Sequence, residues 1–206
     1  MLTLITNRHI CGEEVFVKRV TEALNAGVAQ VILREKDLTS DALFKYAKQL
    51  ILAKEEWQRL IIHSDVSVAC AVNADAIHFT LNDFLSHSKD QIKLLTETYG
   101  LHVGVSIHSK HEALLVQNRG ASYVLASHVF ETDCKAGQPG RGLDFIKQIC
   151  QSVQIPVIAL GGINVSNVSS VLDLDVGGVA LMSELMGATN VTHKCGQLLN
   201  EINKQK

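Results

Sequence analysis

The fold can be predicted from a short pattern that first occurs as Ala26-Gly27-Val28-Ala29-Gln30-Val31-Ile32, where a helix end and a turn residue lead into an apolar segment of strand length. The pattern returns as Val72-Asn73-Ala74-Asp75-Ala76-Ile77, Arg119-Gly120-Ala121-Ser122-Tyr123-Val124 and Leu174-Asp175-Val176-Gly177-Gly178-Val179. Its turn positions Gly27, Asn73, Gly120 and Asp175 are 46, 47 and 55 residues apart. Each interval is long enough for two strand-helix units, so the repeat predicts eight strands.

Apolar runs of strand length occur where this repeat requires them. They are residues 3–5, 31–33, 60–62, 76–79, 103–105, 123–125, 157–160 and 179–182. Stretches with helical periodicity lie between them, such as 16–26 and 41–54, and each strand is expected to lead into a helix. An alternating chain of this kind forms either a closed barrel or an open doubly wound sheet, and the fourfold repeat favours closure. We therefore predict that residues 1–206 form a single α/β domain, a (β/α)8 TIM barrel.

The composition excludes several classes of protein. Of the 206 residues, 47% are hydrophobic and 19% are charged, which is typical of a compact globular chain. The net charge of −2 without a basic run gives no reason to expect nucleic acid or a membrane as a partner. The odd count of five cysteines, with no C-x-x-C pair, argues against a disulfide framework and a zinc site. We expect a cytoplasmic protein with reduced thiols that binds a small molecule.

Barrels of this type carry their functional residues at the C-terminal ends of the strands. Gly161 and Gly162 follow the seventh predicted strand, and Met182-Ser183 lies at the end of the eighth. Glycines let backbone N–H groups approach an anion, so these residues predict a phosphate site. The plainer alternative is that the glycine pair only makes a tight turn.

Other strand ends carry cationic or titratable side chains. Arg34 and Lys36 follow the second strand and could bind an anion at the mouth, although the same pattern also suits an ordinary solvated loop. His128 follows the sixth strand among apolar neighbours. Its imidazole suits proton transfer near neutral pH, but a core histidine would give the same pattern.

The segment that contains His128 resembles a known family. Residues 123–135, followed by Gly140-Arg141-Gly142, closely resemble the sixth-strand motif of the TenI-type thiazole tautomerases. The resemblance extends to residues 33–36, 104–109, 156–163 and 180–183, so it spans nearly the whole chain. The wider superfamily is that of thiamine-phosphate synthase.

Two departures from the synthase pattern favour the tautomerase. Where the synthases carry Asn-Asp-Arg after the third strand, with the Asp as a magnesium ligand, this chain has His63-Ser64-Asp65, which leaves Asp83 without a carboxylate partner. A diphosphate leaving group needs a hard cation held by carboxylates. The Thr-x-Thr-Lys loop of the synthases is also altered, to residues 132–135, and Glu131 adds negative charge beside it.

The resemblance implies a metal-independent and cofactor-free isomerase of thiamine biosynthesis. It would convert an exocyclic-alkene carboxythiazole phosphate into its aromatic isomer, with His128 as base and then acid. The implied contacts are phosphate on Gly161, Gly162, Met182 and Ser183, carboxylate on Arg34 and Lys36, and further contacts from Ser106, His108, Glu131, Thr132, Cys134 and Lys135. The alternatives are thiamine-phosphate synthase, which joins hydroxymethylpyrimidine diphosphate to thiazole phosphate, and a non-catalytic regulator. A homo-oligomer is left open.

Overall fold

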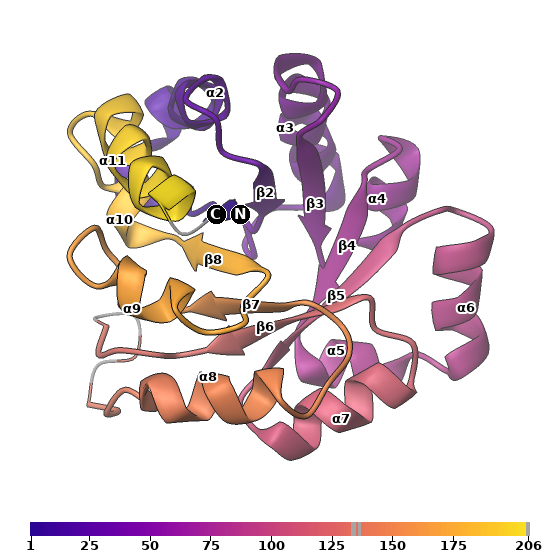
Figure 1. The fold of residues 1–206 in the computed structure, drawn as a ribbon. Helices are drawn as coiled ribbons and strands as arrows, with labels where there is room; N and C mark the ends of the chain where they lie inside the picture. The colour runs from indigo at the N-terminus through magenta and orange to yellow at the C-terminus, as the bar shows by residue number, and fades with distance from the viewer. Residues whose placement is uncertain (133–134, 136, 205–206) are drawn as a thin grey trace.

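In the computed structural model, which describes residues 1–132, 135 and 137–204, eight parallel strands close into a barrel (Figure 1). Each strand pairs with the next along the chain, and β8 returns to β1 with Leu181 opposite Leu4. The strands are β1 (Leu2–Ile5), β2 (Gln30–Leu33), β3 (Arg59–His63), β4 (Ala76–Phe79), β5 (His102–Ile107), β6 (Tyr123–Ser127), β7 (Val157–Leu160) and β8 (Gly178–Leu181). The predicted closed barrel is confirmed, and the open sheet is excluded.

Helices surround the strands (Figure 1). They are α1 (Arg8–Cys11), α2 (Phe16–Asn25), α3 (Ser40–Ala53), α4 (Val66–Ala71), α5 (Leu81–Ser86), α6 (Lys89–Glu97), α7 (Lys110–Asn118), α8 (Gly142–Cys150), α9 (Val168–Leu172), α10 (Ser183–Met186) and α11 (Val191–Lys204), with the 3₁₀ turn η1 (Glu13–Val15) before α2. Side chains fix several starts: Thr39 caps α3, and Ser88 forms a capping box with Gln91 at α6.

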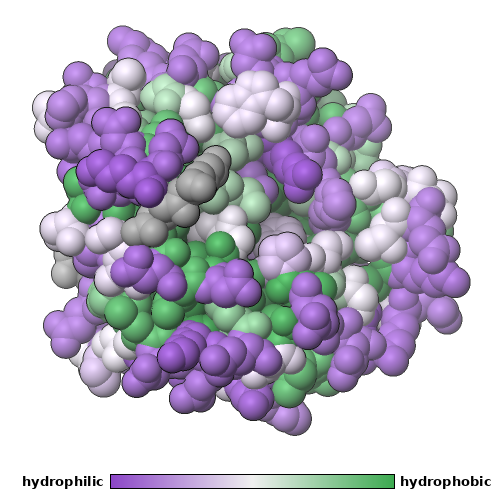
Figure 2. Space-filling view, in the orientation of Figure 1, coloured by the Kyte–Doolittle hydropathy of each residue, from purple (hydrophilic) through white to green (hydrophobic). Residues whose placement is uncertain are grey.

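The strands bury both faces, which explains why they read as continuous apolar runs. Their outward side chains pack against the helices in one large core. Polar residues accordingly dominate the outline of the molecule (Figure 2). The inward side chains form a second cluster inside the barrel: Ile5, Ile32, Ile61, Ala76, Tyr123, Leu125, Ile158 and Ala180. Side chains therefore fill the middle of the barrel, and a cavity can form only beyond this layer, towards an end of the barrel.

Three of the four turn residues of the repeat have a positive φ. Gly27, Asn73 and Gly120 take φ of 101°, 51° and 100°, in the region that favours glycine and asparagine. Several strand limits differ from the prediction by one or two residues, and β5 and β6 extend to Ile107 and Ser127. β8 ends at Leu181, and Met182 is the N-cap of α10, because the chain turns there into the helix.

Cys11, Cys70, Cys150 and Cys195 are free thiols. None of the described helices has the length and apolar character that crossing a membrane requires.

Candidate functional site

A cavity of about 620 Å³ opens at the C-terminal ends of the barrel strands. Ile5, Ile32 and Leu125 of the interior layer contribute to its lining. The cavity also brings together the sequence-predicted residues Arg34, Lys36, Ser106, His108, His128, Glu131, Thr132, Lys135, Gly161, Gly162, Met182 and Ser183. Cys134 lies outside the described residues. The predicted residues thus share one cavity, while the role of each stays a prediction.

Arg34 and Lys36 line the cavity, while the residue between them faces the other way. Glu35 is buried and accepts hydrogen bonds from the Thr6 hydroxyl at 2.6 Å and from the Arg8 backbone N–H at 3.0 Å. Thr6 in turn accepts from the Arg34 N–H at 2.9 Å. The loop after β2 is therefore tied to the end of β1, and this tie directs its two cations at the cavity.

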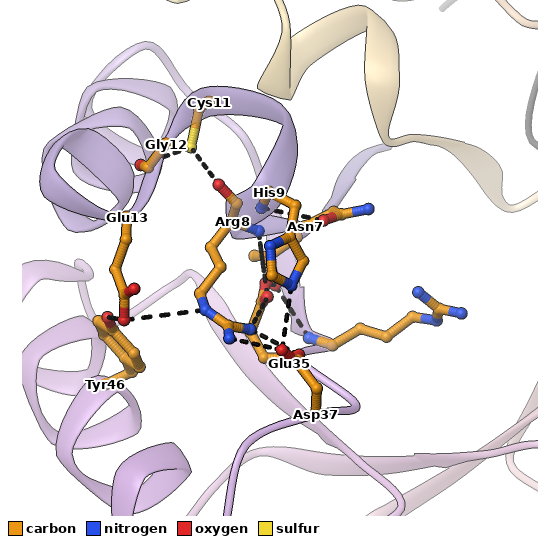
Figure 3. A network of polar contacts seen from close by, with 11 residues as sticks. Asn7, Arg8, His9, Cys11, Gly12, Glu13, Glu35, Asp37 and Tyr46 are labelled. Atoms are coloured by element: carbon orange, nitrogen blue, oxygen red, sulfur yellow. Dashed lines mark hydrogen bonds and ion pairs between the residues drawn. The ribbon is translucent and has the colours of Figure 1, made fainter.

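Arg8 extends this network to the outer surface (Figure 3). Its guanidinium lies 3.3 Å from Glu35 and forms two hydrogen bonds of 2.6 Å to Asp37. These bonds hold the pKa of Asp37 well below its usual range and raise that of Arg8. Glu13 adds a contact from η1, where it also accepts from Tyr46 of α3. Asp37 and Arg8 therefore stay ionised near neutral pH, and their ion pair continues to hold the loop after β2.

The cavity holds three cationic side chains among the described residues: Arg34, Lys36 and Lys135. Repulsion from Arg34 lowers the pKa of Lys36, burial adds to this effect, and attraction to Asp83 opposes it. Cations placed close enough to repel one another favour an anionic ligand, which removes the repulsion when it binds.

The glycine pair after β7 lies against the segment after β6. A Cβ on Gly161 would lie 2.3 Å from the Cβ of His128, and one on Gly162 would lie 2.4 Å from the Glu131 carbonyl oxygen. Both glycines also have positive φ, 108° and 64°. No other residue type fits this turn without displacing residues 128–131. The pair is therefore needed for packing, and phosphate binding by it stays a prediction.

His128 is buried at 2% exposure, yet it lines the cavity. Its Nε2 lies 3.4 Å from the Gln138 carbonyl oxygen, and its Nδ1 has no hydrogen-bond partner in the described part of the chain. A buried nitrogen without a hydrogen-bond partner is unfavourable unless a ligand supplies that partner. The location is thus consistent with a ligand contact, which a histidine in the outer core would not make.

Two histidines of the cavity were not among the predicted site residues. His78 lies inside the apolar run of β4, where Nε2 contacts the Ser106 hydroxyl at 2.8 Å and Nδ1 the Tyr123 hydroxyl at 3.1 Å. His63 ends β3, with its ring centroid 6.1 Å from that of His78. Burial lowers the pKa of His78 to about 3 and that of His63 to about 4, so both rings are neutral at pH 7. The polar residue within an otherwise apolar strand was the available signal.

The ends of β3 and β4 carry the residues that the resemblance compares with a magnesium site. The Ser64 hydroxyl donates to the Asp83 carboxylate at 2.8 Å. Burial alone would raise the Asp83 pKa, but hydrogen bonds from Ser64 and Thr80 hold it below its usual range. Within the described ranges, no group of three or more His, Cys, Asp or Glu residues could hold a metal ion. One carboxylate beside a hydroxyl does not fit a magnesium site built on two carboxylates.

Comparison with known proteins identifies the family. The family model described as Thiamine monophosphate synthase matches residues 2–185. This chain belongs to the thiamine monophosphate synthase family. Thiamine-phosphate synthase of Pyrococcus abyssi is 33% identical over 98% of this chain and 95% of its own length. That of Clostridium acetobutylicum is 30% identical over 98% and 95%. A solved structure titled thiamine phosphate pyrophosphorylase from Pyrococcus furiosus superposes with a TM-score of 0.86 at 32% identity, covering 99% of this chain and 96% of that one.

These relatives correct the functional interpretation of the sequence. The expected thiazole tautomerase is contradicted, because near-full-length relatives at 30–33% identity are named thiamine-phosphate synthase. The interpretation gave too much weight to Ser64 and Glu131. It took the loss of one carboxylate as the loss of diphosphate chemistry, whereas the folded cavity places three cations at its wall. The expected isomerase class and the TenI subtype both depend on the tautomerase activity, and we withdraw them together with it.

Proposed function

We propose that this chain is a thiamine-phosphate synthase, a transferase that joins hydroxymethylpyrimidine diphosphate to thiazole phosphate. The observation that carries the proposal is the similarity to synthases over 98% of the chain. The cavity supports it, since cations on the β2 side and a glycine turn on the β7 side give two separate places for anionic groups.

The reaction itself requires little acid–base chemistry. The thiazole ring nitrogen attacks the methylene carbon of the pyrimidine, a carbon–nitrogen bond forms, and the carbon–oxygen bond to the diphosphate breaks. The leaving diphosphate takes the bonding electron pair, so negative charge grows on its oxygens. Lys36 and Arg34 would stabilise this charge, and their anchor through Glu35 would hold them in place before the reaction.

The other side of the cavity would orient the second substrate. The thiazole phosphate would lie against Gly161, Gly162 and Ser183, which places its ring towards the middle of the mouth. The buried ring of His63 is neutral and would offer a hydrogen bond without adding charge. His78 is also neutral, but its two ring nitrogens contact Ser106 and Tyr123, so it would hold the Ser106 hydroxyl in place at the cavity. Holding two reactants in line contributes much of the rate in reactions of this kind.

The test is to incubate the protein with both substrates and to measure thiamine phosphate by mass spectrometry, in parallel buffers with magnesium and with a chelator. Product in either buffer supports the proposal. Lys36→Met should lower kcat/KM about 10- to 100-fold, because a charged contact to the leaving group is lost. Lys45→Met, on the exposed face of α3, is the matched control and should match the parent. If the folded protein forms no product in either buffer, the proposal fails.

A further inference from the structure

The surroundings of Asp83 show what replaces a second carboxylate at the ends of β3 and β4. Ser64 takes a positive φ of 60°, which turns its hydroxyl onto Asp83 at 2.8 Å. The Asp83 backbone N–H donates to the Thr80 hydroxyl at 3.2 Å, so Asp83 lies in the first turn of α5. The backbone bond fixes Asp83 in the helix, and the Ser64 hydroxyl holds its carboxylate.

The carboxylate of Asp65, the residue after Ser64, accepts hydrogen bonds from other parts of the structure. One oxygen of Asp65 accepts from the Val68 N–H at 2.9 Å and from the Ser67 hydroxyl at 2.7 Å, which caps α4. The other oxygen accepts from the Ser40 hydroxyl of α3 at 2.6 Å. Moving Asp65 to the cavity would break all three bonds, so it does not replace the missing ligand.

The positive charge that a diphosphate needs is already present on side chains. Arg34 repels Lys36 and Asp83 attracts it, so Lys36 lies close enough to both charges to interact with them. Lys135 lines the same cavity. A divalent cation at Asp83 would add to this positive charge, and the single carboxylate that it would meet already accepts a hydrogen bond from Ser64. Magnesium sites use one or two carboxylates together with phosphate oxygens and waters, so a cation here would depend on Asp83 alone for protein charge.

We infer that this site binds diphosphate without a divalent cation, with Lys36 and Arg34 neutralising the anion while Ser64 holds Asp83 out of metal coordination. The inference deepens the proposed function, because it names how the leaving group of that reaction is held. It concerns binding, so it can be tested whether or not the protein forms thiamine phosphate.

The first experiment titrates inorganic pyrophosphate into the protein by calorimetry, with a chelator and then with magnesium. Affinity should be equal in the two buffers or lower with magnesium, because the metal competes for pyrophosphate in solution. Lys36→Met should weaken binding in chelator about tenfold or more, and Lys45→Met should leave it unchanged. A rise of tenfold or more in parent affinity on adding magnesium overturns the inference.

The second experiment restores the carboxylate with Ser64→Asp. Aspartate tolerates positive φ better than most residues, so the fold should survive, which a thermal melt checks. Manganese binding followed by electron paramagnetic resonance should appear in Ser64→Asp and should disappear again when Asp83→Asn is added. The inference fails if the parent binds manganese in a way that Asp83→Asn abolishes, or if folded Ser64→Asp gains no manganese site.

The two proposals can fail separately. Metal-free pyrophosphate binding without thiamine phosphate formation would keep this inference and sink the proposed function. Thiamine phosphate formation together with magnesium-dependent pyrophosphate binding would support the proposed function and overturn this inference.

Discussion

His78 is a buried histidine whose ionisation should appear in the stability of the protein. Its pKa is about 3 in the folded barrel, against about 6.5 for an exposed histidine. Between these values the unfolded chain binds a proton that the folded chain does not, so the free energy of unfolding falls as pH falls. From pH 7 to pH 5 this residue should remove about 2 kcal/mol.

Urea unfolding of His78→Gln at the two pH values tests this claim, because glutamine retains hydrogen bonding without titrating. The variant should lose less stability on acidification than the parent does. His102→Gln, at the exposed start of β5, is the control and should show the parental dependence. An equal loss for the parent and His78→Gln would show that His78 does not carry the effect.

At the scale of elements, the loop after β2 depends on the buried carboxylate of Glu35, which accepts from Thr6 and Arg8. Glu35→Gln places an amide against the Arg8 guanidinium and removes the charge that pairs with it. We expect a loss of about 1–3 kcal/mol in the free energy of unfolding. Pyrophosphate affinity should also fall, because Arg34 and Lys36 lose their common anchor.

Exposed Glu14 of η1 supplies the control, and Glu14→Gln should change neither quantity. Chemical denaturation and calorimetry measure the two effects on the same samples. Parental stability and affinity in Glu35→Gln would mean that the loop holds its cations without the network.

In the molecule as a whole, Tyr123 is one of the side chains that fill the barrel interior, and its ring packs on Gly104. A Cβ on Gly104 would lie 2.0 Å from the Tyr123 ring. Gly104→Ala should therefore destabilise the barrel by about 1–3 kcal/mol. Gly196→Ala is the matched control, because nothing lies within 4 Å of its Cβ position in α11. It should leave stability equal or slightly higher, since alanine favours helix. Thermal melts that rank the two variants the other way would contradict the packing.

The architecture was predictable because its signals are local in the sequence. Turn residues such as Gly27 and Asn73 precede apolar strands, and parallel order follows from the helices between them. The strand ends also predicted much of the cavity lining. His78 was missed because one polar residue in a four-residue apolar run does not reveal which face it occupies. The effect of Ser64 was misjudged because it depends on side chains such as Lys36 that approach only in the folded chain.

A crystal structure with thiamine phosphate and inorganic pyrophosphate tests the proposed function at the level of single contacts. We expect both products in the cavity at the C-terminal ends of the strands. The phosphate group of thiamine phosphate should lie against Gly161, Gly162 and Ser183. The pyrophosphate should lie beside Arg34 and Lys36. Products bound outside this cavity, or a folded protein that binds neither of them at millimolar concentration, would contradict the proposed function.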